Sequence, residues 1–390
     1  MSSTVAEPVV AELKALMDAA NTKDLRAFMN KRIASAAQGE ELKGILAYIS
    51  TYLQETVRTK GAEHIKKISA EVRSLPGLRS TSFIAPLYNI FLVTAECCLQ
   101  AKDYNESMAV AKQYLTAPPS AEMQMRPEDQ LRCATCLLRA STAAHREDMA
   151  DFAATRSLRL YAQAQYAYQR DPTKAISLAL LVEYLHALGA SFSDRHLFGD
   201  ASKVYYDIFC KLKTDTDSLQ RSVVCALLCE AGPKRQRQLA VLHMEPAAHK
   251  LGPLWAVFLK AYRALILDQH DVAVLSGAAA DVPPAILQRA VVQNNILAVS
   301  QIYTNISVPA LVKMLGCVTE AQLVEIIVQM ASEKHIGARL DQTEGWLYFN
   351  VFDSYDELSQ WDEKLGDICN TVSYVSELIG RHHPELTGSA

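Results

Sequence analysis

Residues 333–350, EKHIGARLDQTEGWLYFN, decide the fold class because they predict a β-hairpin in a chain whose other segments are mostly helical. Apolar residues alternate from Ile336 to Leu340, which is typical of a half-buried strand. The segment from Asp341 to Gly345 favours a turn, since aspartate bonds to nearby backbone and glycine accepts a positive φ angle. Trp346 to Phe349 then supply the aromatic and apolar residues of a second strand.

The segments before the hairpin predict the element order of a winged helix. Two prolines after Asp281 mark a boundary, and Asp281 is placed to cap the helix that follows. Next come a short extended piece at 305–307, a helix begun by Ser307 and a helix begun by Thr319. The predicted helices cover 285–303, 308–315 and 320–334, and the hairpin is expected to complete a small sheet with the strand near Ile306.

Upstream of this boundary, amphipathic helices follow one another in a degenerate repeat. In three of them a small residue precedes a tyrosine by a few positions, so that a neighbouring helix can approach while the tyrosine covers the gap. The three pairs are Ala111 and Tyr114, Ser157 and Tyr161, and Ala201 and Tyr205. Their spacing of roughly 45–50 residues is typical of helix-pair solenoids of the tetratricopeptide or HEAT type.

The helix predicted within 356–383 has the most specific pattern in the chain. Apolar residues follow one another at alternating steps of three and four positions, which are the a and d positions of successive heptads. They are Leu358, Trp361, Leu365, Ile368, Val372, Val375 and Ile379, here called the seam. Burying these side chains is worth about 10–20 kcal/mol before conformational entropy is subtracted, so the seam is expected to be covered.

Two surfaces are expected to bind partner proteins. The seam can fold back on its own winged domain or enter a helical bundle with other chains, and its place after the last globular element favours the bundle. The wing is expected to offer an open sheet edge for β-augmentation by a partner strand. The residues assigned to this wing edge are Leu340, Trp346, Leu347, Tyr348 and Phe349.

Composition and charge argue against some classes of partner and indicate the compartment of the protein. A formal net charge of −4 gives no general attraction to nucleic acid or to an anionic membrane. The third helix of the predicted winged domain carries Glu320, Glu325 and Glu333 against the single cation Lys334, so it is not expected to read DNA. Nine cysteines without a framework spacing indicate a reducing compartment, and the most apolar segment is too short and too charged to span a membrane. We expect a soluble, intracellular protein.

No catalytic, cofactor-binding or metal-ligating residues are predicted. Cys133 and Cys136 form a CxxC on an apolar helix face, but a zinc site needs four ligands and no second pair follows, so both are interpreted as core cysteines. The basic run at 57–73 is interleaved with glutamates and lacks aromatic residues for base stacking, so it is interpreted as a solvated face of the solenoid. The short basic cluster at 234–237 is interpreted as a helix connection rather than a nuclear signal.

Four segments resemble PCI-domain proteins, a family of scaffolds shared by the proteasome lid, the COP9 signalosome and a translation initiation factor. LQRAVVQNNILAVSQIYTNIS (287–307) resembles the first winged-domain helix and the strand after it, and IGARLDQTEGWLYF (336–349) resembles the wing. WDEKLGDICNTV (361–372) resembles the terminal helix, and LLCEAGPKRQRQLAVL (227–242) resembles a helical passage before the PCI core. The likeness is strong over 195–380 and weak before it.

Within the family, the motifs are most similar to a scaffold subunit of the COP9 signalosome, with Trp361, Asp362 and Cys369 in matching places. The resemblance implies a non-catalytic protein of the cytoplasm and nucleus, without cofactors, that assists recognition of cullin–RING ubiquitin ligases and removal of the ubiquitin-like modifier from cullins (deneddylation). It implies that the winged helix and last helix bind other signalosome subunits and that the N-terminal solenoid contacts the ligase, with no nucleic-acid or membrane partner. A proteasome lid scaffold of the subunit 5 type and a nucleic-acid-binding PCI protein remain the alternatives.

The sequence therefore predicts an all-α fold with a small winged-helix β-hairpin. A helical-repeat solenoid is followed by a PCI domain with a helical and a winged-helix part, and then by a bundle helix. The predicted boundaries are 1–194 for the solenoid, 195–282 for the helical part of the PCI domain, 283–352 for the winged helix, 353–383 for the bundle helix and 384–390 for a tail.

Overall fold

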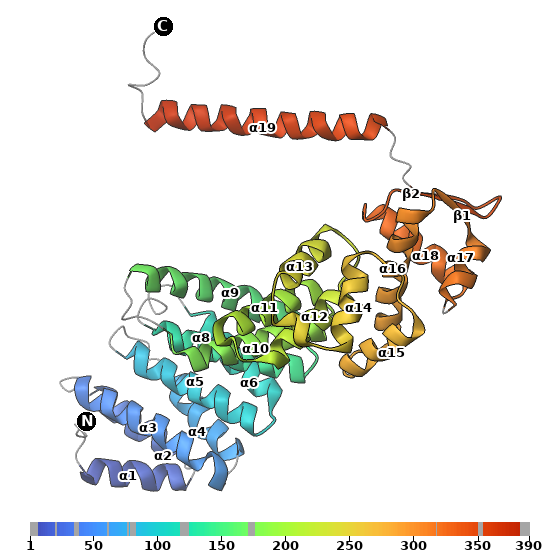
Figure 1. Ribbon diagram of the computed structural model, residues 1–390. Coiled ribbons are helices and arrows are strands. Elements are labelled where there is room, and N and C mark those ends of the chain that lie inside the picture. The colour runs from blue at the N-terminus through green and yellow to red at the C-terminus, as the bar shows by residue number, and fades with distance from the viewer. Residues whose placement is uncertain are drawn as a thin grey trace. The chain divides into compact units, whose positions relative to one another are not determined.

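In the computed structural model, the chain folds into two compact units, Met1–Ala226 and Leu227–Ala390 (Figure 1). It describes residues 7–19, 22–34, 39–60, 62–75, 78, 83–117, 125–170, 176–316, 318–349 and 354–382. The predicted boundary at 352/353 and the predicted tail at 384–390 lie outside these ranges. The fold class is confirmed, because the described elements are helices apart from one small three-stranded sheet.

The first unit begins with four helices that share one apolar core. The helices are α1 (Glu7–Asp18), α2 (Thr22–Ala34), α3 (Gly39–Lys60) and α4 (Ala62–Ser74). Leu13, Met17, Leu46 and Ile65 are fully buried in this core, and apolar residues of the next helix belong to the same core. The apolar stripes therefore face inward, as the helical spacing requires.

Consecutive helices then pack as three pairs, which confirms the helix-pair solenoid. The pairs are α5 (Ile84–Gln100) with α6 (Tyr104–Leu115), α8 (Pro127–Ala143) with α9 (Glu147–Arg170), and α10 (Leu178–Asp194) with α11 (Phe198–Leu212). In Figure 1 these helices follow one another along the first unit in chain order. Each pair shares a face with the next, so the core is continuous through the repeats.

The turn inside each pair is the same structure three times. One residue takes a left-handed conformation, and the backbone N–H that follows it bonds back over the end of the preceding helix, as in a Schellman motif. The left-handed residues are Lys102, His145 and His196, and the bonds run from Asp103 N to Cys98 O, Arg146 N to Ser141 O and Leu197 N to Phe192 O, each at 2.9 Å. None of the three is glycine, the residue that adopts this conformation without strain, so the left-handed positions themselves could not be predicted from the residue type.

The small-residue and tyrosine pairs mark close helix contacts, with one correction. Tyr205 is buried against Gly189 of α10, where an added Cβ would lie 2.9 Å from the tyrosine ring. The buried Ser157 hydroxyl accepts a hydrogen bond at 3.2 Å from Tyr184 of the next pair, so Tyr184 covers this serine. The predicted partner, Tyr161, is only half-buried, because the covering ring comes from the neighbouring repeat.

The second unit opens with short helices that lead to the winged helix. They are α12 (Thr216–Leu228), which crosses the boundary between the units, α13 (Pro233–His243), the 3₁₀ turn η3 (Ala248–Lys250), α14 (Pro253–Tyr262) and α15 (Gln269–Ala278). Proline stands in the first turn of α13 and of α14, where its missing N–H costs no hydrogen bond. An Asp268 and Asp271 capping box begins α15.

The winged helix has the predicted order of elements. They are α16 (Pro284–Ile302), β1 (Asn305–Ser307), α17 (Val308–Leu315), α18 (Glu320–Ser332), β2 (Ala338–Asp341) and β3 (Trp346–Phe349). The strand order is β1-β3-β2 and both pairings are antiparallel. A reciprocal capping box of Thr319 and Gln322 begins α18, as the sequence suggested for Thr319. Ser307 stands at the N-cap of α17 without a side-chain cap bond, and Pro283 takes the N-cap of α16 in place of Asp281.

The helical part of the second unit and the winged helix are joined by three consecutive amides of α16. Gln293 Oε1 accepts from the Ala231 backbone at 3.3 Å, and Asn294 Oδ1 accepts from the Arg235 guanidinium at 3.0 Å. Asn295 exchanges two hydrogen bonds with the Leu267 backbone, at 2.8 and 3.1 Å. The three side chains are buried, so they satisfy polar groups that the apolar core would leave unpaired.

Candidate protein-interaction site

The seam lies on α19 (Ser354–His382), a helix of 29 residues. The seam side chains from Trp361 onward are exposed, with fractions between 43% for Ile379 and 62% for Trp361 and Val372. The side chain of Leu358 lies outside the described residues. Six apolar side chains at heptad spacing, each about half exposed or more, form a continuous apolar stripe of the kind that helices bury against other helices.

The surroundings of the seam suit burial at a helix interface. The Lys364 ammonium lies over the Trp361 ring, 5.6 Å from its centroid, which is the geometry of a cation–π contact. Cys369 lies next to Ile368 and is exposed. The opposite face carries small polar residues such as Asn370 and Ser373, which are exposed and suit solvent.

Four of the five residues predicted at the edge of the wing lie in the central strand of the sheet. Trp346, Leu347, Tyr348 and Phe349 form β3, which is the central strand and pairs with β1 on one side and β2 on the other. Leu347 and Phe349 are buried in the core of the winged helix. The hairpin pattern alone does not reveal which of its strands a third strand joins. Among the described strands, the sheet therefore has two edge strands, β1 and β2, and the free edge within the hairpin is that of β2, of which only Leu340 was predicted.

The backbone of β2 shows which residues face this free edge. Phe349 donates to Thr304 O at 2.8 Å and Val308 donates to Gly345 O at 2.9 Å, so Gly345, Leu347 and Phe349 direct their backbone groups toward β1. The alternate residues of β3 then bond to Arg339 and Asp341 of β2. Ala338 and Leu340 consequently direct their N–H and C=O groups away from the sheet.

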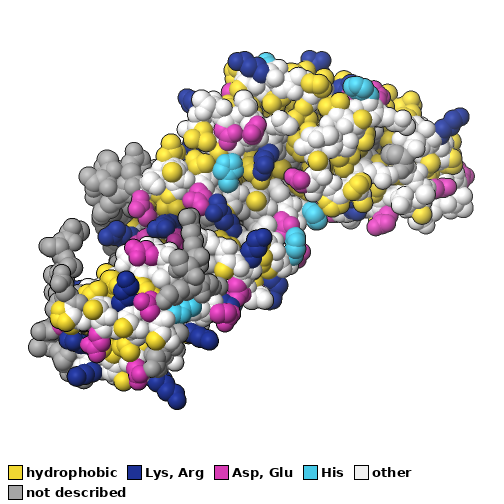
Figure 2. Space-filling model, turned by 90° about the horizontal axis from the view of Figure 1, so that it is seen from below, with side chains coloured by type: hydrophobic (Ala, Val, Ile, Leu, Met, Phe, Trp, Pro, Cys, Tyr) yellow, Lys and Arg dark blue, Asp and Glu magenta, His cyan; other side chains and the backbone are white. Residues whose placement is uncertain are grey.

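The third helix of the winged domain has the acidic outer face that the sequence predicted. Leu323, Ile326, Ile327 and Met330 are buried, while Glu320 and Glu325 are exposed and α18 carries no lysine or arginine. On the face of the molecule in Figure 2, cationic and anionic side chains are interspersed. Phosphate groups would meet like charge along α18, so this helix does not suit the DNA major groove.

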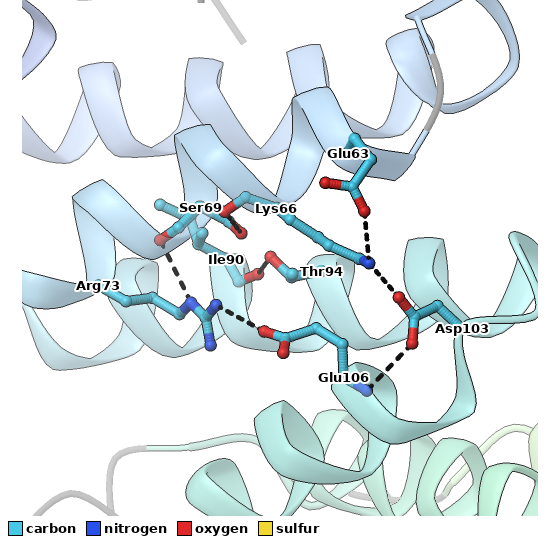
Figure 3. A network of polar contacts seen from close by, with 8 residues as sticks. All are labelled: Glu63, Lys66, Ser69, Arg73, Ile90, Thr94, Asp103 and Glu106. Carbon is cyan, nitrogen blue, oxygen red and sulfur yellow. Dashed lines mark hydrogen bonds and ion pairs between the residues drawn. The ribbon is translucent and has the colours of Figure 1, made fainter. Parts of the chain in front are cut away.

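The basic run at 57–73 holds structural ion pairs rather than only solvated cations (Figure 3). Lys66 of α4 contacts Asp103, the N-cap of α6, and also Glu63 at 2.9 Å. Arg73 reaches Glu106 at 3.4 Å and donates to the Ser69 carbonyl at 3.2 Å. The reason is the fold, since α6 brings its acidic first turn beside α4. Two cations of the run are therefore paired with carboxylates and help to hold α4 against α6.

The cysteines of the CxxC are core residues, as predicted. Cys133 and Cys136 are buried in α8, and burial raises the pKa of both thiols, to about 12 for Cys136. The described residues hold no group of three or more histidine, cysteine or carboxylate side chains placed to share a metal ion. Along the same ranges, no helix is long and apolar enough to cross a membrane.

One buried cation was missed by the sequence reasoning. Arg235 belongs to the basic cluster at 234–237, yet its side chain is only 3% exposed, while Lys234 and Arg237 are exposed. Burial lowers the pKa of the Arg235 guanidinium to about 10. The helical spacing carries a weak signal, because Arg235 lies four residues before the buried Leu239.

Comparison with known proteins shows what parts of the chain are similar to. Residues 284–351 match the PCI domain family. The chain is 31% identical over 208 residues to COP9 signalosome complex subunit 4 of Dictyostelium discoideum, covering 49% of this chain and 50% of that protein. It is 27% identical over 211 residues to the subunit 4 of Caenorhabditis elegans, covering 51% and 50%, and 28% identical over 163 residues to that of Arabidopsis thaliana, covering 40% of each.

The chain spans about half the length of the curated relatives it matches. The matched PCI residues include the whole of α16, the three strands and the acidic α18, so the match and the observed winged helix coincide. The resemblance found in the sequence is thereby confirmed: residues 284–351 match the PCI domain family and, over about half its length, the chain is similar to subunit 4 of the COP9 signalosome.

Proposed function

We propose that this chain is a non-catalytic scaffold subunit of a COP9 signalosome, and that it acts in assembly of the complex and in recognition of cullin–RING ubiquitin ligases for deneddylation. The observation that carries the proposal is the exposed seam of α19, in a chain similar to signalosome subunits. An apolar stripe of this length is costly to leave in water, so a scaffold subunit that buries it among sibling helices accounts for it.

The sheet supports the same proposal through a second kind of contact. β2 is an edge strand in which Ala338 and Leu340 offer backbone groups to a partner. An incoming strand would satisfy these groups and extend the sheet, which is how winged helices can join side by side. Seam and edge together supply one helical and one extended contact to neighbouring subunits.

The first unit is proposed to contact the ligase. A helix-pair solenoid presents an extended surface whose small turns and exposed helix faces can meet a large partner. The committed ion pairs of Lys66 and Arg73 leave less free positive charge on the run at 57–73 than its sequence implies, so this run is not proposed as the contact. We propose the cytoplasm and nucleus as the compartments in which the chain acts.

Two alternatives are less well supported. A proteasome lid subunit would use the same kinds of surface, but the relatives described above are signalosome subunits. A nucleic-acid-binding PCI protein would need cations on α18 or an open basic groove, whereas Glu320 and Glu325 occupy the outer face of that helix. A gel shift with duplex DNA and RNA at low salt tests this second alternative, and tight, salt-sensitive binding would favour it.

The test of the seam is a double substitution, Leu365→Asp with Val372→Asp, in the full chain expressed in cells. Two carboxylates in the seam would be buried without partners in any bundle, so co-purification of sibling subunits should fall at least about tenfold. Asn370→Asp with Ser373→Asp is the matched control, since it adds the same charge to the opposite, exposed face of α19. Circular dichroism of both variants checks that helix content is unchanged.

The outcome shows whether the seam is buried among helices of other chains or against the second unit of its own chain. If the seam variant loses sibling subunits and the control keeps them, the scaffold function is supported. If both variants co-purify signalosome subunits as the unaltered chain does, the bundle proposal fails. If the seam variant instead unfolds the second unit while the control does not, the seam packs on its own chain and the proposal fails as well.

A further inference from the structure

The three-stranded sheet of the winged helix has two faces of different character. Leu347 and Phe349 of β3 are buried in the apolar core beneath the sheet. Because successive side chains of a strand point to opposite faces, Trp346 and Tyr348 lie on the outer face. Trp346 is 38% exposed and Tyr348 is partly exposed, so the central strand places two aromatic rings at the surface.

The pairing register shows which side chains share this outer face. Arg339 of β2 lies opposite Tyr348, and Asp341 lies opposite Trp346. On the other side of β3, Asn305 of β1 lies opposite Tyr348. Directly opposed residues of an antiparallel pair point to the same face of the sheet. The surface formed by Trp346, Tyr348 and Arg339 is here called the aromatic face.

Arg339 supplies a cation that is available to a partner. It is exposed and forms no ion pair with any described residue. The carboxylate of Asp341 is used within the hairpin turn, where Oδ1 accepts from the backbone of Thr343 at 2.9 Å and of Glu344 at 3.2 Å. A guanidinium without a local counter-ion attracts a carboxylate and can bind it through two parallel hydrogen bonds.

The spacing of the two rings suits one flat apolar group that contacts both. Residues two apart in a strand lie about 7 Å from each other, and strand side chains stand roughly perpendicular to the sheet. Carbon atoms in van der Waals contact lie about 3.5–4 Å apart, which leaves room for one layer between the rings. Within the described ranges, no ring contact joins Trp346 to Tyr348, so stacking does not close this space.

We propose that the aromatic face binds an extended, proline-containing segment of a partner protein that also carries an aspartate or glutamate. A proline ring of the segment contacts Trp346 and Tyr348, and the carboxylate pairs with Arg339. Proline-rich segments hold the polyproline II conformation before they bind, so they lose little conformational entropy on an aromatic surface. Tryptophan, tyrosine and arginine are also the residue types that carry most of the binding energy in protein interfaces.

A protein segment suits the aromatic face better than a nucleic acid does. Single-stranded nucleic acids also stack on aromatic rings, but their phosphates need several cations along the binding surface. Arg339 is the single cation of the three described strands, and Asp341 lies on the same face. The inference does not depend on the signalosome function proposed above, because it uses neither the seam nor the outward backbone groups of β2.

The test uses two libraries of short peptides displayed on phage and selected against the full chain. One library has a fixed Pro-Pro between random flanks, and the other has Ala-Ala at the same place. The proline library is expected to yield peptides with an aspartate or glutamate at a constant distance from the prolines. The alanine library is expected to yield no peptide whose binding requires Trp346.

Fluorescence anisotropy of the selected, labelled peptides then measures the contribution of each residue. Trp346→Ala and Arg339→Glu should each weaken binding at least about tenfold, because one removes ring surface and the other reverses the charge. Exchanging the acidic residue of the peptide for its amide should weaken binding to the unaltered chain but not to Arg339→Glu. The matched controls are Tyr262→Ala and Arg263→Glu at the exposed end of α14, which should change the affinity less than about twofold.

Other outcomes would overturn the proposal. It fails if the proline library yields no binding peptide, if both libraries yield peptides of equal affinity, or if the variants and their controls weaken binding equally. It also fails if single-stranded RNA binds in a Trp346-dependent manner while the peptides do not. A dimer that sediments as such in the unaltered chain and is lost in Trp346→Ala would assign the face to a second copy. Circular dichroism checks the fold of each variant, and Arg339→Glu carries the test should Trp346→Ala not fold.

Discussion

Arg235 of α13 donates a hydrogen bond to Asn294 of α16 at 3.0 Å, and this contact fastens the helical part of the second unit to its winged helix. The same amide donates to the Leu265 carbonyl at 3.1 Å, so one side chain holds two segments. Gly232 lies against the His335 ring, where an added Cβ would be 2.8 Å away. The sequence boundary at 282/283 is therefore bridged by side chains, and we expect the two parts to unfold together.

The first prediction concerns this amide. Asn294→Ala removes the acceptor of a buried guanidinium and the donor to Leu265, so the free energy of unfolding of the second unit should fall by about 1–3 kcal/mol. Urea unfolding followed by the fluorescence of Trp255 and Trp346 measures the change. Asn370→Ala, on an exposed face of α19, is the control and should lie within about 0.5 kcal/mol of the unaltered chain. Equal effects of both substitutions would contradict the role assigned to Asn294.

A second prediction compares the effects of alanine substitution at two helical glycines. Gly189→Ala puts a methyl group 2.9 Å from the buried Tyr205 ring, so it should destabilise the first unit by about 1–3 kcal/mol in spite of the better helix propensity of alanine. Gly366→Ala in α19 meets nothing within 4 Å and should raise helix content. Thermal unfolding by circular dichroism compares the two. A stabilising effect of Gly189→Ala would show that Tyr205 has room to move.

The third prediction is a pH dependence. The hydrogen bond from Lys66 lowers the pKa of Asp103 below its usual value of about 4. A carboxyl group with a lowered pKa stabilises the fold above its unfolded pKa, and this contribution is lost as the pH falls through the folded pKa. Asp103→Asn should therefore reduce stability at neutral pH and make little difference in acid. The effect should be small, because solvent screens the pair, and a difference that grows toward low pH would contradict it.

Thiol reactivity provides a fourth prediction. Burial raises the pKa of Cys136 to about 12 and that of Cys133 well above its usual value, so neither is expected to form the reactive thiolate at neutral pH in the folded chain. Cys210 and Cys369 are exposed and should react with maleimide within minutes. Mass spectrometry of the alkylated peptides, with and without denaturant, gives the order of reaction. Labelling of Cys133 before Cys369 in native buffer would contradict the burial.

The fifth prediction tests the free sheet edge. Ala338→Pro deletes an N–H that faces away from β3, so the ladder within the sheet is kept while the outward edge loses a donor. If the chain assembles as proposed, association through this edge should weaken, whereas Ala338→Gly, which keeps the N–H, should change it less. Pull-down yields of the two variants give the comparison. Equal yields would show that the β2 edge does not contribute to assembly.

Much of the winged helix could be predicted from local signals. Thr319 and Gln322 have the spacing of a capping box at the start of α18, and Pro309 in the first turn suits the start of α17. The turn before β3 could be predicted because Gly345 is a glycine, and the structure shows it in the left-handed conformation that glycine adopts without strain. The seam spacing in α19 was also visible, because heptads are a property of the sequence alone.

Other features depend on contacts that no local pattern encodes. The central position of β3 results from packing of β1 on the hairpin, so Leu347 became a core residue although the sequence placed it at an edge. Lys102, His145 and His196 adopt left-handed turns because the helices they join are held by tertiary packing. Arg235 was interpreted as part of a basic helix connection, and its bond to Asn294, which is distant in the sequence, accompanies its burial.

The strand order has a consequence for synthesis on the ribosome. β1 and β2 each pair only with β3 among the described strands, and β3 is translated last of the three. The apolar core to which Leu347 and Phe349 belong therefore stays incomplete while the polypeptide emerges. We expect newly made chains to require protection by a chaperone until residue 349 has left the exit tunnel, and truncation before β3 to yield aggregation-prone protein.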